Sequence, residues 1–361
     1  MLITTADSLP RLMACIGSLQ LEDNPTPAGA TKNEVREEGI AFHYMIEKIF
    51  ANEFSSDELV DRKSPNGVLM TDFMAECADE YLDTLKSEPG TLDIEVDCIN
   101  AGDGYQVNGR ADARQTDLVN DVLTITDAKF GWSVVEPERN WTLISHAVST
   151  SKQNGWLPKR VVLRIYQPRS QGHDGPWRTW EITGSELYDL NLEIEQRLQN
   201  PTSDLRSGPQ CDYCPKKVGC DANLKAMFNA IDVSSVAFQD TLTVDQLSAQ
   251  MTTMNAAMKR LKKRVDAYEE HMIYRLQQGE VIPGYGFERK AGREYIPSEI
   301  TPEIMQQMAP GKDVVKKTVR TPKQMLAAGV DPAIVNSLKK STKKTVLVAM
   351  SATERAKKSF G

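Results

Sequence analysis

The chain is organised around Gly109-Arg-Ala-Asp-Ala113 and the later stretch Val122-Leu-Thr-Ile-Thr-Asp-Ala-Lys-Phe-Gly131. Both segments read as strands, and each contains a carboxylate near its end. Residues two apart in an extended chain point to the same face, so Asp127 and Lys129 project together. If the two strands pair as a hairpin, Asp112 lies beside them. Two carboxylates and one ammonium group at the end of a hairpin suit a divalent cation with a phosphate or a water next to it.

An Asp-x-Lys triplet at a strand end also has a simpler explanation, which is a solvated edge or a plain ion pair. The choice between these explanations depends on the other motifs in the chain.

Length and composition indicate a globular protein with more than one domain. The chain has 361 residues, of which 40% are hydrophobic and 26% are charged. No apolar run approaches the roughly 18 residues of a membrane span. The N-terminus lacks the basic and then apolar order of a secretory signal. We therefore expect no membrane partner and a cytoplasmic location, where cysteines are ligands or inert thiols rather than disulfides.

The net charge of −7 hides a strong asymmetry along the chain. Residues 251–361 contain 21 Lys and Arg against 11 Asp and Glu, a net charge of +10, and the remainder carries −17. A basic segment can follow a polyanion such as DNA, and it can equally be a well-solvated helical surface.

Hydrophobic periodicity predicts a mixed α/β (α+β) fold. Strands are expected at residues 91–98, 105–110, 122–128, 161–167 and 178–182. Helices are expected within 1–20 with Ser8 as a cap, over 37–50, within 56–87, over 138–149, and over 186–199 with Ser185 as a cap. This order predicts a mixed central sheet flanked by helices.

Three cysteines lie close together after a Gly-Pro loop, and their spacing indicates a metal site: Cys211, Cys214 and Cys220. Cys77 falls within a predicted helix and Cys98 ends a predicted strand, so both read as buried thiols. Cys15 lies in a short segment followed by a loop, and it is the natural fourth ligand. Four thiolates can hold zinc or an iron–sulfur cluster, and the arrangement of one pair, one single and one distant residue favours the cluster.

The region from residue 231 onward follows a predicted linker around Ser234 to Thr243. A long helix is predicted from Asp245 to Gln278. Its apolar residues recur at spacings of four and three: Leu247, Met251, Met254, Met258, Leu261, Val265, Tyr268 and Met272. This heptad seam over residues 247–272 suits a helical hairpin within the chain or self-association. A basic hairpin is predicted at 285–296, and a strand at 345–349.

Three motifs in this order resemble those of RecB-like members of the PD-(D/E)XK nuclease superfamily. They are the segment Gly39 to His43, the Gly-Arg-Ala-Asp of 109–112 and the Asp-Ala-Lys of 127–129. The added cysteines look like the iron–sulfur subgroup, which includes the AddB nuclease domain and the CRISPR-associated adaptation nucleases. An uncharacterised phage and prophage branch is more similar still. It shares Cys-x-Gly-Ser near the start, Glu-Gly-x-x-x-His after it, and Ile-Tyr-Gln-Pro-Arg at 165–169.

The resemblance covers residues 1–230 well and extends weakly to the end of the chain. It implies that His43, Asp112, Asp127 and the backbone carbonyl of Ala128 bind a catalytic Mg²⁺ or Mn²⁺. Lys129 would position the attacking water and stabilise charge on the phosphate. The resemblance also implies a 4Fe-4S cluster, with zinc as the alternative, on four cysteines: Cys15, Cys211, Cys214 and Cys220.

One departure from the superfamily pattern concerns substrate binding. The third motif of the superfamily has a Gln and, four residues later, a Tyr on the helix after the lysine strand. Thr142 and His146 occupy those positions here. Both can form hydrogen bonds, but their reach differs, so the pose of the substrate is expected to differ too.

Together these observations predict a metal-dependent DNA nuclease, an exonuclease acting in phage or prophage recombination, repair or replication inside a bacterial host cell. Residues 1–230 would form the nuclease domain, and residues 231–361 a largely helical, basic domain that binds DNA or a partner. Five cations beside Leu261 are the expected phosphate contacts: Lys259, Arg260, Lys262, Lys263 and Arg264. A helicase, a single-strand-binding protein or an annealing protein is a conceivable partner. The alternatives are an endonuclease or nickase, and a non-catalytic DNA-binding assembly protein on the same fold.

Overall fold

The computed structural model describes residues 1–24, 34–169, 175–235, 243–295, 300, 302–312, 322–327, 329–338 and 340–349. The described residues divide into two compact units, one up to Val265 and one from Asp266 onward. The division falls inside a long helix. The functional division expected near residue 230 stays a prediction.

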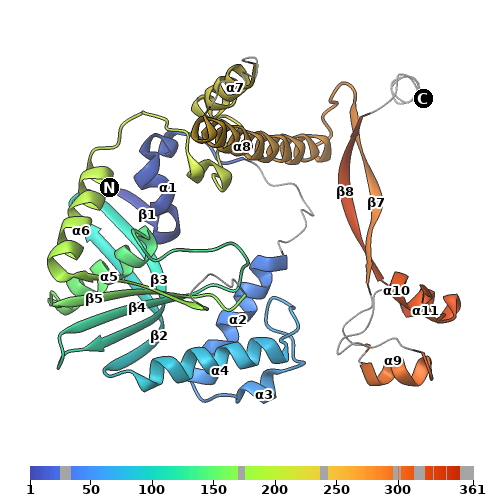
Figure 1. The fold of residues 1–361 in the computed structure, drawn as a ribbon, viewed down its shortest axis with the longest axis horizontal. Coiled ribbons are helices and arrows are strands. Elements are labelled where there is room, and N and C mark those ends of the chain that lie inside the picture. Colours follow the sequence, from blue (N-terminus) through green and yellow to red (C-terminus); the bar gives the residue numbers. More distant parts are fainter. Residues whose placement is uncertain are drawn as a thin grey trace. The chain divides into compact units, whose positions relative to one another are not determined.

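A mixed sheet of six strands, counted over the described residues, forms the centre of the first unit (Figure 1). The strands are β1 (Leu2–Thr5), β2 (Thr91–Gly102), β3 (Tyr105–Asp117), β4 (Val122–Ala128), β5 (Arg160–Tyr166) and β6 (Trp177–Thr183). Their order is β1-β3-β4-β5-β6, and β2 pairs with the other edge of β3. The β1–β3 and β4–β5 pairs are parallel and the other pairs are antiparallel. The predicted mixed sheet is therefore confirmed.

Strand β3 changes partner along one of its edges. Residues 105–108 pair with β1, and residues 113–117 pair with β4. Gly109, Arg110, Ala111 and Asp112 lie between these two pairings. The Gly-Arg-Ala-Asp motif therefore stands where the sheet opens, and its side chains can reach a ligand.

Helices cover both faces of the sheet (Figure 1). Helices α1 (Leu9–Ala14), α5 (Trp141–Asn154) and α6 (Gly184–Gln199) enclose one core, whose members include Leu12, Leu123, Leu143, Leu163 and Leu190. Helices α2 (Glu34–Phe50) and α4 (Asp72–Ser87) enclose the other, whose members include Phe42, Met45, Tyr81, Phe130 and Tyr166. Short 3₁₀ turns lie at η1 (Ala6–Ser8), η2 (Ile16–Gln20) and η3 (Pro209–Asp212). The predicted flanking helices are therefore confirmed.

Several local details differ from the sequence-based expectations. Strand β1 was not predicted, because four residues of moderate β propensity gain their pairing only from distant β3. The helical region 56–87 is split into α3 (Ser56–Leu59) and α4 by an irregular segment. Helix α6 is capped by Thr183 rather than Ser185, since the Thr183 hydroxyl and the Glu186 carboxylate form a capping box. Ser8 occupies the predicted cap position of α1, but its side chain makes no capping hydrogen bond.

Beyond the sheet, α7 (Asp221–Ser235) precedes the long helix α8 (Val244–Gln277). Helix α8 was predicted within a residue at each end, while most of the predicted linker between the two helices lies outside the described residues. Six residues of the heptad seam on α8 are exposed: Leu247, Met251, Met258, Leu261, Val265 and Tyr268. Packing within the described part of the chain therefore does not bury the seam, and self-association through it stays a prediction.

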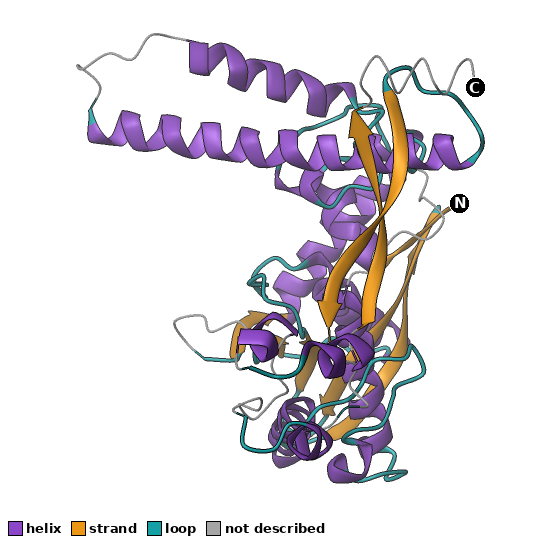
Figure 2. Ribbon diagram, turned by 90° about the vertical axis from the view of Figure 1, so that its right-hand side faces the viewer, coloured by secondary structure: helices purple, strands orange, loops and turns teal. Residues whose placement is uncertain are grey.

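The second unit contains a two-stranded ribbon and three short helices (Figure 2). Strand β7 (Tyr285–Tyr295) runs antiparallel to β8 (Lys340–Ala349), from Tyr285 opposite Ala349 to Tyr295 opposite Lys340. The hairpin predicted within 285–296 is therefore wrong, and the strand predicted at 345–349 is confirmed. Helices α9 (Pro302–Met308), α10 (Pro322–Ala327) and α11 (Pro332–Leu338) contribute Met305, Met325 and Val335 to a small core.

No helix among the described residues is long and apolar enough to span a lipid bilayer.

Candidate metal centre

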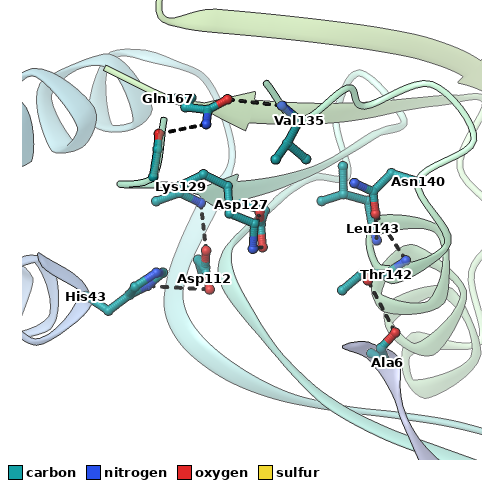
Figure 3. A network of polar contacts seen from close by, with 12 residues as sticks. Ala6, His43, Asp112, Asp127, Lys129, Val135, Asn140, Thr142, Leu143 and Gln167 are labelled. Carbon is teal, nitrogen blue, oxygen red and sulfur yellow. Dashed lines mark hydrogen bonds and ion pairs between the residues drawn. The ribbon is translucent and has the colours of Figure 1, made fainter. Parts of the chain in front are cut away.

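Helix α2 carries a histidine to the edge of the opened sheet. Phe42 and Met45 are buried in the second core, and Phe42 stacks on Phe130 with ring centroids 4.5 Å apart. This packing fixes the rotation of the helix, and His43 then faces Asp112, which lies in the middle of β3 rather than at the strand end expected from the sequence (Figure 3). Its Nδ1 atom lies 3.6 Å from Oδ1 of Asp112 and 3.3 Å from Oε1 of Glu95. The ligand atoms of these three side chains all lie within 4.8 Å of one another.

The pairing of β3 with β4 brings the two predicted aspartates and the lysine together, as expected from the sequence. Oδ2 of Asp112 accepts a hydrogen bond of 2.6 Å from the backbone N–H of Ala128. The ammonium group of Lys129 lies 2.9 and 2.8 Å from the two carboxylate oxygens of Asp127 (Figure 3). The N–H of Ala128 thereby holds the Asp112 carboxylate in place, and the Lys129 ammonium group offsets the charge of Asp127.

These side chains line one cleft of about 680 Å³. The cleft contains His43, Asp112, Asp127 and Lys129, which the sequence predicted as the site. It also contains Thr142 and His146, which the sequence predicted as substrate contacts. Five further residues of the lining were not predicted as site residues: Asp7, Tyr44, Glu47, Glu95 and Arg110.

The electrostatics of the cleft favour a bound cation. Burial lowers the pKa of His43, but the charges of Asp112, Glu95 and Asp127 outweigh it and raise this pKa to about 9. Burial, together with the charge of Asp127, raises the pKa of Asp112 despite the opposing effects of His43 and Lys129. The pKa of Lys129 is raised by Asp127 and Asp112, although burial acts against it. The carboxylates therefore favour positive charge in the cleft, and in the metal-free site bound protons supply it. A metal ion can replace such protons.

Glu95 is an acidic residue of the cleft that was not predicted from the sequence. In the β2–β3 hairpin Ile94 pairs with Ala113 and Val96 with Ala111, so Glu95 stands opposite Asp112. A signal for this was present in the sequence. Asp103-Gly104 between two alternating strands is a strong two-residue hairpin signal. Counting back along both strands from that turn would have placed Glu95 across from Asp112.

Thr142 and His146 project from α5 toward the same cleft. The Thr142 hydroxyl donates a hydrogen bond of 3.2 Å to the carbonyl of Ala6, so this group holds the N-terminal segment in place (Figure 3). His146 is buried, and burial lowers its pKa. A Cβ atom on Gly109 would lie only 2.5 Å from Cε1 of His146. The histidine therefore explains why a glycine opens the Gly-Arg-Ala-Asp motif.

The Ile-Tyr-Gln-Pro-Arg segment supports the loop that follows Lys129. The buried Gln167 side chain donates to the carbonyls of Gly131 and Ser133 at 2.9 and 2.8 Å, and accepts from the N–H of Val135 at 3.1 Å (Figure 3). The Arg169 guanidinium lies 3.8 Å from the ring centroid of Phe130. These contacts fix the chain at the end of β4, next to Asp127 and Lys129.

The four cysteines predicted as ligands gather at one place. All four are buried: Cys15, Cys211, Cys214 and Cys220. Burial raises the pKa of the Cys214 thiol, and the neighbouring thiols of Cys220 and Cys15 raise it further. Burial likewise raises the pKa of Cys211, with Cys214 and Cys220 among its neighbours. Cys77 and Cys98 belong instead to the two hydrophobic cores, where the sequence placed them.

Backbone groups also point toward this thiol group. The N–H of Arg206 donates to Sγ of Cys15 at 3.3 Å, and the N–H of Gly208 donates to Sγ of Cys211 at 3.5 Å. Such hydrogen bonds stabilise thiolates and tune the metal group that they hold. Four buried thiols, two of them with N–H donors, have the chemistry to hold a metal or an iron–sulfur cluster.

Three of the five predicted cations of α8 contact the cysteine loop or the segment just before it. Nζ of Lys259 lies 2.5 Å from Oδ2 of Asp212, and the Arg260 guanidinium lies 3.4 Å from Oγ of Ser207. Arg264 is only 6% exposed. Its guanidinium donates to three carbonyls: those of Lys217 at 2.9 Å, Val218 at 2.8 Å and Cys220 at 3.2 Å.

The phosphate-contact role predicted for Arg264 is therefore wrong in this structure, because its side chain is enclosed and used by the backbone. The sequence pattern placed it on an exposed face, whereas tertiary packing turned it inward. Lys262 is exposed and Lys263 is half-buried, and both remain candidates for phosphate contact.

One family model, described as a protein of unknown function (DUF2800), matches residues 3–353 of the chain. The comparison with curated proteins gave no match. Among solved structures, the protein called SSO0001 is 15% identical, with a TM-score of 0.28, over 61% of this chain and 86% of its own. A protein from Eubacterium rectale, described as "Putative exonuclease", is 11% identical, with a TM-score of 0.29, over 62% of this chain and 82% of its own. Such low TM-scores do not establish a shared fold, so the function has to be argued from this chain's own residues.

Proposed function

The chain belongs to the family described as a protein of unknown function (DUF2800), and we propose that it is a metal-dependent nuclease that hydrolyses phosphodiester bonds in DNA. One observation carries the proposal. His43, Glu95 and Asp112 bring three ligand atoms within 4.8 Å of one another, in a cleft that also holds the Asp127–Lys129 pair. Imidazole with carboxylates suits Mg²⁺ or Mn²⁺. The motifs that carry His43, Asp112, Asp127 and Lys129 are also those that resemble the PD-(D/E)XK nucleases.

The proposed roles follow from where each group lies. His43, Asp112, Asp127 and the carbonyl of Ala128 would hold the ion. A divalent ion in such a site supplies a nucleophilic hydroxide near neutral pH and screens charge that develops on the phosphate. Lys129 adds a fixed positive charge at the same place, where the surrounding protein excludes most of the water. Its ion pair with Asp127 keeps the ammonium group aimed into the cleft before substrate arrives.

The finer proposal is an exonuclease, in keeping with the resemblance, and it is tested by the form of the DNA. End-labelled linear and circular DNA, each single- and double-stranded, should be incubated with Mg²⁺ or Mn²⁺. We expect linear DNA to be shortened from its ends while circles stay intact. Cleavage of circular DNA would show that the protein is an endonuclease or nickase instead. Binding of DNA without cleavage under all conditions would assign the non-catalytic alternative.

The same proposal includes a 4Fe-4S cluster on Cys15, Cys211, Cys214 and Cys220, with zinc as the alternative. Its support is the burial of the four thiols and the two N–H donors directed at them. The cluster would act in structure rather than in hydrolysis, since the cysteines do not line the acidic cleft.

A further inference from the structure

We propose that Glu95 is a direct ligand of the catalytic ion. This inference rests on the proposed function, because it concerns the same cleft. It adds a carboxylate, from a strand that carries no recognised motif, to the site formed by α2, β3 and β4.

The distances around Glu95 match the spacing of ligands on one ion. Its Oε1 atom lies 3.3 Å from Nδ1 of His43, which itself lies 3.6 Å from Oδ1 of Asp112. Two ligands at right angles, each about 2.1 Å from an octahedral ion, are separated by about 3 Å. Small side-chain movements therefore suffice for all three groups to bind the same ion.

The backbone of Glu95 is unusual for its place in the fold. Its φ angle is 55°, in the left-handed region that residues other than glycine seldom adopt. The described chain has four other such residues, Asn52, Asp61, Asp121 and Arg139, and each of them lies in a turn. Glu95 instead lies within a paired strand, where regular pleating would alternate the side chain with its neighbours. The distortion accompanies a side chain that faces His43 and lines the cleft.

A second role for Glu95 would be purely positional. Carboxylates often accept a hydrogen bond from one ring nitrogen of a histidine whose other nitrogen binds a metal. The two roles differ in what they need from Glu95. Positioning needs only an oxygen that accepts a hydrogen bond, which a glutamine amide also provides. Ligation of a divalent cation depends strongly on the charge of the carboxylate, because a neutral amide oxygen is a much weaker ligand.

Glu95→Gln therefore separates the two roles. Calorimetric titration with Mn²⁺ should compare the full-length wild type with Glu95→Gln, and with Asp93→Asn as a matched control. Asp93 lies on the same strand, and its charge is paired with Arg114 at 2.8 Å. We expect Glu95→Gln to weaken Mn²⁺ binding by about tenfold or more, and Asp93→Asn to bind as the wild type does. A loss smaller than tenfold in Glu95→Gln would overturn direct ligation.

Glu95→Gly guards against a folding artefact. Glycine adopts a φ of 55° without steric cost, so this variant should melt no lower than the wild type. We expect it to show the same weakened Mn²⁺ binding, and wild-type affinity in Glu95→Gly would also overturn the inference. Failure of the proposed function is distinguishable. Wild-type protein that binds Mn²⁺ through Glu95 yet cleaves no DNA would leave the ligand assignment intact and remove the nuclease.

Discussion

At the scale of single residues, Asp127 and Lys129 show how two neighbours on one strand prepare a reactive site. Asp127 is 8% exposed, and an isolated buried carboxylate would be costly. The ammonium group of Lys129, two residues further along the chain, supplies the compensating positive charge. Asp112 adds a second carboxylate, whose side chain is 14% exposed, so the two acids repel each other unless a cation is present. The groups proposed to act in catalysis are therefore also the source of this electrostatic strain.

Asp127→Asn and Lys129→Met should each reduce DNA cleavage by about 10²–10³-fold, because each removes charge that acts on the phosphate or the ion. Their effects on metal-free stability should differ. Lys129→Met leaves the Asp127 and Asp112 carboxylates without their ammonium partner and should lower the melting temperature, whereas Asp127→Asn removes a repulsion between the two carboxylates and should not. Cleavage assays beside thermal melts test both points. Lys159→Ala, at a side chain that is 85% exposed, is the control, and wild-type cleavage by either site variant would contradict the assignment.

The affinity for Mn²⁺ should rise with pH. In the metal-free site His43 has a pKa of about 9, so at neutral pH it carries a proton that an incoming ion must displace. Each unit of pH below about 9 should therefore cost close to tenfold in affinity, with Asp112 adding to the slope at the acidic end. Calorimetric titrations across this range, in two buffers of different ionisation enthalpy, measure the affinity and the protons released. His43→Ala should flatten the slope, and an unchanged slope in that variant would remove the imidazole from the site.

At the scale of elements, helix α8 and the cysteine loop depend on each other. The loop from Cys211 to Cys220 has only one short 3₁₀ turn of its own, so many of its carbonyls lack regular partners. Arg264 satisfies three of them with one guanidinium, and Lys259 neutralises Asp212. A cationic run that resembled a DNA-binding surface in the sequence thus serves in part to hold a loop.

Arg264→Ala should destabilise the protein by about 3 kcal/mol, since it leaves several buried carbonyls without a charged donor. The stability of Arg264→Lys should fall between those of the wild type and Arg264→Ala, because one ammonium group cannot reproduce the hydrogen bonds of the planar guanidinium. Denaturant unfolding and the metal content of purified protein are the measurements. Lys262→Ala, on the exposed face of the same helix, should change stability by no more than about 0.5 kcal/mol. Equal stability of Arg264→Ala and Lys262→Ala would show that the three hydrogen bonds contribute nothing.

Lys262 and Lys263 should account for part of the DNA affinity. Replacing both by Gln removes two possible phosphate contacts, which should lower the slope of log affinity against log salt by up to about 1.8. Binding isotherms at several salt concentrations, run beside light scattering, provide the test. An unchanged slope with loss of self-association would assign this helix to protein contacts along its exposed heptad seam.

At the scale of the whole chain, Cys15 near the N-terminus lies with the Cys211–Cys220 loop, which follows the last strand of the sheet. The chain between them is about 200 residues long and contains strands β2 to β6. The proposed shared metal group would close that loop in the folded state, and by analogy with a disulfide it would stabilise the fold by up to about 5 kcal/mol. Folding and metal loading would then be coupled.

Protein purified without oxygen should be brown and contain iron. Cys15→Ala, Cys211→Ala, Cys214→Ala and Cys220→Ala should each lose the iron and melt at a lower temperature. Cys77→Ala and Cys98→Ala, which remove buried thiols from the cores, should keep it. Elemental analysis and absorption spectra measure this directly. Stoichiometric zinc in place of iron would establish the zinc alternative, and wild-type protein free of both would contradict a metal site.

The sequence by itself determined those features whose physics is local or repeats along the chain. Alternation of apolar residues located β2 to β6, and helical periodicity located α2, α5, α6 and α8. The two-residue period of a strand was enough to place Asp127 beside Lys129. One conditional step, the pairing of two adjacent strands, then brought in Asp112. Cysteine spacing likewise singled out Cys211, Cys214 and Cys220, and the short segment around Cys15 suggested the fourth thiol, which lies near Cys214 in the fold.

Only the tertiary structure decided features that depend on partners far apart in the sequence. Strand β1 exists because β3 pairs with it, and β7 pairs with β8 across about 50 residues rather than folding on itself. The hairpin signal at Asp103-Gly104 could have placed Glu95 opposite Asp112, but its left-handed backbone within a paired strand is visible only in the fold. Arg264 faces inward because the cysteine loop presents carbonyls to it. A side chain's role follows from its neighbours, and at these positions the neighbours are supplied by the fold rather than by the adjacent sequence.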